Sequence, residues 1–268
     1  MGMQISQSIG IVGASGWLAV ALVLPAVARG VVDPARLVLS SRSGGKGALA
    51  GIPARWTTDN AALARDCDVV ILSVRPDQFG AVAVDLRGKL AISVMAGISC
   101  ARIAGHTGAA RIVRAMPNAA AAIARSFTPW FAQEGVTAED KELAQAFFAA
   151  SGEAAEVPKE THIDYCAGLT GAGAAFPALL AESMMAHAIG QGLPPAFAAR
   201  AAKGVVCGAS QLFASETART GAIVQEMIDY RGTTAAALQA MLDAGFMKAV
   251  ASGLEAAAAK SARLAVDN

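Results

Sequence analysis

The feature that most constrains the fold is a short apolar run that ends in a glycine-rich turn near the N-terminus. Residues 8–13 (SIGIVG) predict a strand, and residues 17–29 predict the helix that follows it. The turn between them places its small residues at Gly13, Gly16 and Ala19, one position wider than the common GxGxxG/A spacing, as though Ser15 were inserted. Such a turn lets the backbone approach a pyrophosphate, which the helix N-terminus then binds. The pattern therefore predicts a dinucleotide site.

Strand and helix patterns alternate through the first half of the chain. Further strands are predicted at residues 36–40, 68–74, 90–95 and 111–115. The run Asp68–Val74 is almost continuously apolar, which is typical of a parallel strand buried on both faces. Alternation of this kind predicts an α/β fold, a doubly wound Rossmann sheet.

The second half has little strand signal beyond Val157 and consists of alanine-rich stretches broken by glycine and proline. We therefore predict a nucleotide-binding domain over residues 1–155 and an all-helical substrate and dimerisation domain over residues 156–268. The chain contains 64 alanines and only 5% aromatic residues. Because alanine-rich helices bury little area, we expect the helical half to complete its core against a second copy.

Composition and charge exclude several classes of partner. A net charge of +1 with 16% charged residues gives no basic surface for nucleic acid or acidic membranes. The early apolar run over residues 17–28 is shorter than the ~20 residues of a membrane span. No Lys or Arg precedes Arg29, so the charged region of a signal peptide is missing. We expect a cytoplasmic enzyme.

The cysteines and histidines do not predict a metal site. Cys67, Cys100, Cys166 and Cys207 are widely separated, and the three histidines lack the spacing of metal ligands. We interpret the cysteines as reduced core residues and expect no metal.

The end of the second predicted strand indicates which nicotinamide cofactor binds. An acidic residue there would accept hydrogen bonds from the ribose diol of NAD, whereas arginine pairs with the 2′-phosphate of NADP. This chain has Ser40-Ser41-Arg42-Ser43 and no acid nearby. The two hydroxyls and the guanidinium favour NADPH.

Six segments, in order along the chain, resemble the pyrroline-5-carboxylate reductase family, which catalyses the last step of proline biosynthesis. They are residues 40–43 (SSRS), 69–76 (VVILSVRP), 92–98 (ISVMAGI), 114–118 (RAMPN), 170–176 (TGAGAAF) and 232–238 (GTTAAAL). The resemblance implies an oxidoreductase with a Rossmann domain, a helical dimerisation domain and an active site shared across a homodimer or a larger assembly of dimers. No lysine follows Gly171-Ala172-Gly173, which argues against the related β-hydroxyacid dehydrogenases.

The resemblance also assigns candidate site residues. Those implied to bind the cofactor are Gly13, Ala14, Ser15, Gly16, Trp17, Leu18, Ser41, Arg42, Asn60, Val74, Arg75, Pro76, Ala96 and Gly97. Asn118 is implied to lie near the nicotinamide and the substrate. The substrate loop is implied to comprise Asp229, Tyr230, Arg231, Gly232, Thr233 and Thr234. Thr234 is the candidate substrate anchor and proton donor.

This substrate loop departs from the family's pattern, VTSPGGTT. Asp229 stands at the serine position, and Tyr230 and Arg231 stand at the Pro-Gly positions. An ionised Asp229 would repel a substrate carboxylate. In one interpretation the substrate keeps its carboxylate, and Arg231 either pairs with Asp229 or binds that carboxylate itself. In the other, the pocket binds a different imine or carbonyl substrate. In residues 116–120 and 170–176, Ala or Phe stands at positions where the family's pattern has residues with hydroxyl groups. These replacements fit the same reassignment of the pocket. They also fit neutral drift at positions that only pack.

Reduction of a C=N bond needs a hydride on carbon and a proton on nitrogen. A pyrroline nitrogen can be protonated near neutral pH, so positioning in a dry pocket would supply much of the catalysis. The leading hypothesis is NADPH-dependent reduction of a cyclic imine, with L-1-pyrroline-5-carboxylate converted to L-proline. The alternatives are reduction of another imine or carbonyl substrate and a nucleotide-binding dimer that has lost catalysis.

Overall fold

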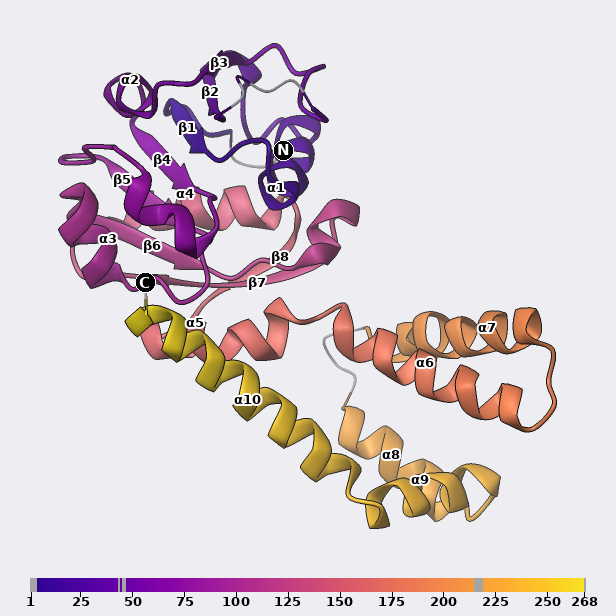
Figure 1. The fold of residues 1–268 in the computed structure, drawn as a ribbon. Coiled ribbons are helices and arrows are strands. Elements are labelled where there is room, and N and C mark those ends of the chain that lie inside the picture. Colours follow the sequence, from indigo (N-terminus) through magenta and orange to yellow (C-terminus); the bar gives the residue numbers. More distant parts are fainter. Residues whose placement is uncertain (1–3, 43, 45–46, 215–218, 268) are drawn as a thin grey trace. The chain divides into compact units, whose positions relative to one another are not determined.

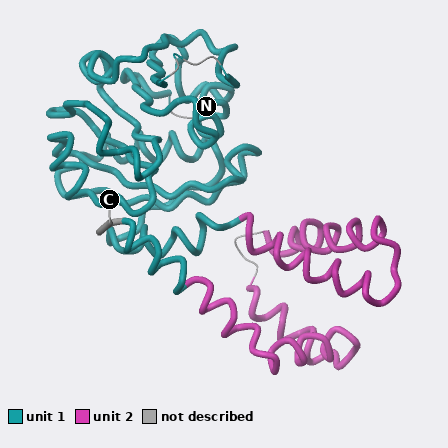
Figure 2. Tube along the Cα trace, viewed as in Figure 1, with its two compact units in different colours: residues 1–173, 255–268 teal, residues 174–254 magenta. Residues whose placement is uncertain are grey.

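The computed structural model of the chain describes residues 4–42, 44, 47–214 and 219–267 (Figure 1). Ser43, which ends the predicted cofactor-selecting segment, lies outside the described residues. The chain divides into two compact units, coloured separately in Figure 2. Unit 1 comprises residues 1–173 and 255–268, and unit 2 comprises residues 174–254.

Unit 1 is built on an eight-stranded sheet in the order β3-β2-β1-β4-β5-β6-β7-β8. Its strands are β1 (Ile9–Val12), β2 (Leu37–Ser40), β3 (Arg55–Thr57), β4 (Val69–Leu72), β5 (Leu90–Ser93), β6 (Arg111–Ala115), β7 (Ser126–Ala132) and β8 (Gly152–Glu156). All neighbours pair in parallel except β6 and β7, which are antiparallel. The strand order reverses between β1 and β4, as in dinucleotide-binding sheets.

Alternate side chains of the central strands enter two separate cores. Ile11 and Ile71 belong to one core, which also contains residues of α1 (Trp17–Ala28) and α4 (Ala138–Ala149). Val70 and Leu72 belong to the other, with residues of α2 (Asn60–Asp66) and α3 (Cys100–Thr107). Burial on both faces explains why these strands are apolar at every position.

The expected α/β fold is confirmed, and the five predicted strands are present as β1, β2, β4, β5 and β6, each within two residues of its predicted ends. The sequence interpretation missed β3, β7 and β8. The first is a three-residue edge strand, β7 contains Pro129, and β8 (GEAAE) lacks β-branched residues. Strand β8 forms because β7 pairs with it rather than through intrinsic preference, whereas Pro129 masked the strand-favouring Phe and Trp residues of β7.

The chain leaves the sheet through α5 (Glu160–Cys166) and a π-helical turn at Ala167–Gly171. Unit 2 then contains α6 (Ala175–Gly190), α7 (Pro195–Lys203), a π-helical turn (Gly204–Gly208), a 3₁₀ helix (Ala209–Phe213), α8 (Thr220–Asp229) and α9 (Thr233–Asp243). The long helix α10 (Phe246–Asp267) starts in unit 2 and ends in unit 1. The predicted helical second half is confirmed. The boundary at residues 155 and 156 stays a prediction.

Unit 2 has almost no core of its own. Among its described residues only Ala198 and Ala202 are buried, whereas Leu179 and Met247 are 66% and 68% exposed. Cys207 is also exposed, so its assignment to the core was wrong for a single copy of the chain. The physical reason is that alanine side chains bury little area and leave their larger neighbours uncovered. The stretch Glu160–Gly190 is long and apolar enough to cross a membrane by length and composition only.

Candidate functional site: a nucleotide pocket at the sheet edge

A pocket of about 610 Å³ lies at the carboxyl ends of the strands around the reversal of strand order. It is lined by loops after β1, β2, β3 and β4 and by a 3₁₀ helix at Pro76–Ala81. The described lining residues are Val12, Gly13, Ser15, Gly16, Ser40, Ser41, Arg42, Thr58, Asn60, Ser73, Val74, Arg75, Asp77, Gln78, Ala81 and Val82. Sheets of this topology bind ligands at this edge.

The glycine turn forms the part of the pocket that leads into α1. The amides of Gly13 and Ala14 donate to the Ser40 carbonyl at 3.0 and 2.9 Å, which joins the turn to the end of β2. Gly13 has φ +88°, a conformation open mainly to glycine. Helix α1 begins at Trp17, and its N-cap residue, Gly16, has no side chain that could cap it. Its first-turn amides therefore lack intrahelical acceptors and can bind an anion.

Polar side chains gather where β2 ends and α2 begins. The Ser40 hydroxyl donates to Asn60 Oδ1 at 2.5 Å, which leaves the Asn60 amide NH₂ to donate elsewhere. Arg42 is exposed and forms no ion pair with any described residue. Thr58 lines the same pocket. The hydroxyls of Ser40 and Thr58 and the guanidinium of Arg42 therefore line the same pocket as the amide of Asn60.

The pocket brings together eight of the predicted cofactor residues: Gly13, Ser15, Gly16, Ser41, Arg42, Asn60, Val74 and Arg75. The other six, Ala14, Trp17, Leu18, Pro76, Ala96 and Gly97, are not among its described lining residues. Ala14 is fully buried, and Trp17 is 63% exposed at the start of α1. Ala96 and Gly97 follow β5, one strand farther along the sheet.

The structure adds lining residues that the sequence interpretation missed. Thr58 follows β3, which was not predicted, and Asp77 and Gln78 lie in the 3₁₀ helix after β4. Asp77 accepts hydrogen bonds from Arg75, with 3.2 Å between Nε and Oδ1. In the sequence, these three residues could have been identified only by their position shortly after strands whose carboxyl ends lie at the same edge of the sheet.

Two motifs distant in sequence pack together in unit 1. The side-chain amide of Asn118 donates to the Thr170 carbonyl at 2.9 Å, and its Oδ1 accepts from the Ala120 amide at 2.9 Å. A Cβ on Gly173 would lie 2.8 Å from the Thr170 oxygen and 3.1 Å from Asn118 Nδ2. The glycines of the 170–173 segment therefore allow it to pack closely against Met116 and Asn118, which follow β6.

The predicted substrate loop lies in unit 2, between α8 and α9. Asp229 ends α8 and accepts a hydrogen bond from Gln225 Nε2 at 2.9 Å. Its pairing with Arg231, one of the alternatives that the sequence left open, is not among the ion pairs of the described residues. Arg231 has φ +58°, which explains why the family's pattern has glycine there. Gly232 precedes α9, while Thr233 and Thr234 are exposed in its first turn.

Two family models match separate parts of the chain. Residues 8–97 match the model described as NADP oxidoreductase coenzyme F420-dependent. Residues 160–264 match the model described as pyrroline-5-carboxylate reductase dimerisation. The second match supports self-association and covers the helices whose apolar side chains are exposed.

Several similar proteins are named pyrroline-5-carboxylate reductase. A pyrroline-5-carboxylate reductase of Synechocystis is 31% identical over 214 residues, covering 78% of this chain and 80% of the relative. A solved structure of a pyrroline-5-carboxylate reductase from Coxiella burnetii is 28% identical, with a TM-score of 0.86 and coverage of 97% and 99%. The Plasmodium falciparum enzyme, solved with NADP bound, shares the fold at 23% identity and a TM-score of 0.84, with coverage of 98% and 100%.

Proposed function

The chain belongs to the pyrroline-5-carboxylate reductase family, and from this premise we propose that it reduces L-1-pyrroline-5-carboxylate to L-proline with NADPH. The observation that carries the proposal is the nucleotide pocket at the reversal of strand order, where the glycine turn meets Arg42. The Plasmodium falciparum enzyme, which shares the fold, was solved with NADP bound.

The residues of the pocket fit NADPH part by part. The free amides in the first turn of α1, including those of Trp17 and Leu18, bind the pyrophosphate. Arg42 and the hydroxyls of Ser41 and Thr58 bind the 2′-phosphate, since no acidic side chain follows β2 to repel it. The Asn60 amide donates to a ribose hydroxyl.

The remaining predicted contacts lie along the loops after β4 and β5. Val74, Arg75 and Pro76 follow β4, and Ala96 and Gly97 follow β5. We assign these loops to the nicotinamide half of the cofactor. When bound, NADPH supplies a hydride to the imine carbon.

On the substrate side, the chain's own residues hold the carboxylate and the ring nitrogen. Asp229 is already hydrogen-bonded to Gln225, so Arg231 is the charged side chain left to bind the carboxylate, together with the first-turn amides of α9. The Thr234 hydroxyl anchors the substrate and donates a proton to the ring nitrogen as the carbon receives the hydride, and Thr234 then regains a proton from solvent water. Gly232 lets the backbone turn into α9, where Thr233 is the first helical residue.

We further propose that the working form is a homodimer or a larger assembly of dimers in the cytoplasm, with neither nucleic acid nor membrane as a partner. The exposed apolar side chains of unit 2 lie within the segment that matches the dimerisation model. A second copy would remove them from water.

A second candidate function is favoured by the substrate loop, where Asp229, Tyr230 and Arg231 replace the family's Ser-Pro-Gly. These residues suit reduction of another imine on the same scaffold. A nucleotide-binding dimer without catalysis is the third reading.

One assay separates the three. Purified protein is mixed with NADPH and L-1-pyrroline-5-carboxylate, and the loss of NADPH absorbance is followed beside a panel of cyclic imines. We expect turnover of pyrroline-5-carboxylate, a strong decrease in Thr234→Val and retention in Thr234→Ser. Turnover of another imine alone supports the second candidate, and tight NADPH binding without any turnover supports the third.

A further inference from the structure

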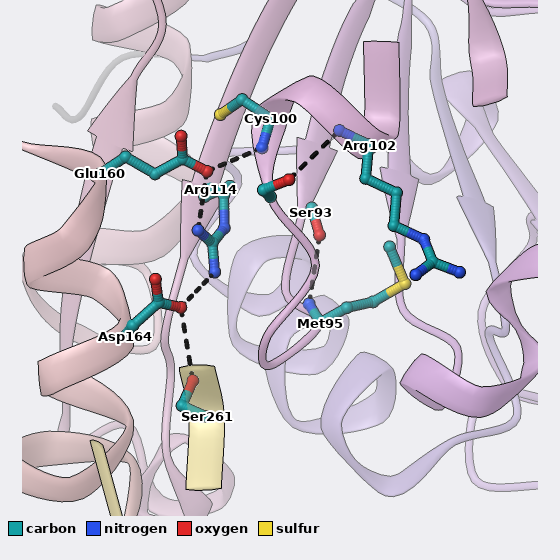
Figure 3. Close-up of polar contacts among 9 residues, drawn as sticks. Ser93, Met95, Cys100, Arg102, Arg114, Glu160, Asp164 and Ser261 are labelled. Carbon is teal, nitrogen blue, oxygen red and sulfur yellow. Dashed lines mark hydrogen bonds and ion pairs between the residues drawn. The ribbon is translucent and has the colours of Figure 1, made fainter. Parts of the chain in front are cut away.

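A charged cluster buried in unit 1 lies outside the nucleotide pocket and the substrate loop. Its centre is Arg114, on β6, whose side chain is only 2% exposed. Figure 3 shows its guanidinium between two carboxylates of α5: Nη1 donates to Glu160 Oε1 at 2.7 Å and Nη2 to Asp164 Oδ1 at 2.8 Å. Burying a charge is costly unless it is paired in this way.

The electrostatics keep this guanidinium charged. Burial lowers the pKa of Arg114, but the hydrogen bonds from it to Asp164 and Glu160 outweigh burial and raise the pKa above its usual value. Arg114 Nε finds no hydrogen-bond partner among the described residues. A buried donor without a partner costs stability, so packing alone does not explain why an arginine occupies this position.

The Glu160 branch of the cluster reaches the loop after β5. Glu160 Oε1 also accepts the amide of Cys100 at 2.7 Å, and Cys100 is the first residue of α3. The six residues between β5 and α3 include Ala96 and Gly97. Glu160 therefore holds one end of the loop that we assign to the nicotinamide half of the cofactor.

The Asp164 branch reaches the two helices that connect unit 1 with unit 2. Asp164 Oδ1 also accepts from the Ser261 hydroxyl of α10 at 3.3 Å, and Ser261 is 3% exposed. Helix α5 leads to the point where the chain leaves unit 1, and α10 carries the point where it returns. Asp164 Oδ1, on α5, thus accepts hydrogen bonds both from Ser261 of α10 and from Arg114 of the sheet.

We propose that Arg114 is a positioning residue of the reductase, which fixes the Ala96–Gly97 loop through Glu160 and the two connecting helices through Asp164. This inference rests on the proposed function. It predicts that the two branches have separable effects, because each carboxylate holds a different part of unit 1.

The test cuts one branch at a time. Glu160→Ala should raise the Kd of NADPH by about tenfold and change the dimer dissociation constant by less than about twofold. Asp164→Ala should raise the dimer dissociation constant by about tenfold and change the Kd of NADPH by less than about twofold. The Kd is measured by NADPH fluorescence and the dimer constant by sedimentation. Should an alanine variant fail to fold, Glu160→Gln and Asp164→Asn carry the same comparison.

The matched control is Glu156→Gln, which breaks the exposed ion pair with Lys141 and should leave both constants unchanged. The proposal is overturned if both branch variants lower only the Tm, or if they change both constants to the same extent. Wild-type turnover of pyrroline-5-carboxylate is recorded separately. Its absence would reject the proposed substrate, while the two binding constants would still decide the role of Arg114.

Discussion

Gly13 and Ser73 lie so close that a Cβ added to Gly13 would stand 2.3 Å from the Ser73 carbonyl oxygen. Because the obstructing atom belongs to the backbone of the loop after β4, no side-chain rotation relieves the clash. The contact brings together the ends of β1 and β4, the two strands between which the order of the sheet reverses.

Replacing Gly13 by alanine should therefore destabilise the protein by about 2 kcal/mol or more, because the clash adds to the cost of a positive φ. It should also weaken NADPH binding, since the turn must shift. Urea unfolding and fluorescence titration measure the two effects. Gly105→Ala is the matched control: it lies within α3 with nothing within 4 Å of its Cβ and should lose no stability. Equal behaviour of the two variants would contradict the prediction.

Arg42→Ala should raise the Kd of NADPH by about tenfold or more and leave that of NADH nearly unchanged, because only NADPH carries the 2′-phosphate. Both constants come from fluorescence titration. Arg65→Ala removes a guanidinium from α2 that does not line the pocket and should change neither. If Arg42→Ala weakens both cofactors equally, Arg42 does not bind the phosphate.

Asn118→Ala should lower the free energy of unfolding by about 1–3 kcal/mol, because the Thr170 carbonyl and the Ala120 amide lose their partner in a buried site. Gln7→Ala, which removes the exposed side-chain hydrogen bonds of Gln7 with Glu139 and Ser6, should cost less than about 0.5 kcal/mol. Urea unfolding compares the two. A similar loss in both would mean that the contact with the 170–173 segment adds nothing.

Cys67 should resist thiol reagents in the native protein at pH 8. Burial raises the pKa of its thiol to about 11, so only about one molecule in a thousand carries the reactive thiolate at that pH. For Cys100, burial and then Glu160 raise the pKa to about 12, which gives the same expectation. Peptide mapping after brief labelling identifies the modified residues, and denatured protein serves as the positive control. Rapid native labelling of Cys67 would show that it is not enclosed in the core.

The protein should have a mass in solution of twice its chain mass of 27.0 kDa or a larger even multiple of it, measured by light scattering. Leu179→Asp places a charge on an exposed apolar position of α6 and should shift the mass toward one chain. Ile123→Asp changes a residue of unit 1 that is 74% exposed and lies outside the dimerisation match, so it should leave the mass unchanged. A monomeric wild type would remove the dimer from the proposal.

The central strands and the glycine turn could be predicted from sequence because their signals are local. An apolar run such as Asp68–Val74 has the same meaning wherever it lies, and a glycine at residue 13 marks a conformation that other residues avoid. Arg42, which lines the pocket, was predicted for the same reason, since it follows a predicted strand directly. The sequence alone thus determined the five central strands, the edge at which the glycine turn lies and the preference for a cofactor with a 2′-phosphate.

The tertiary structure decided which distant residues meet. Thr58 joins the pocket only because β3, which has no strand signal, pairs with β2. Arg114 is separated from Asp164 and Ser261 by long stretches of chain, and no spacing rule links them. Hydrophobic periodicity specifies elements, whereas partners across the fold are selected by packing and by the cost of leaving a buried charge unpaired.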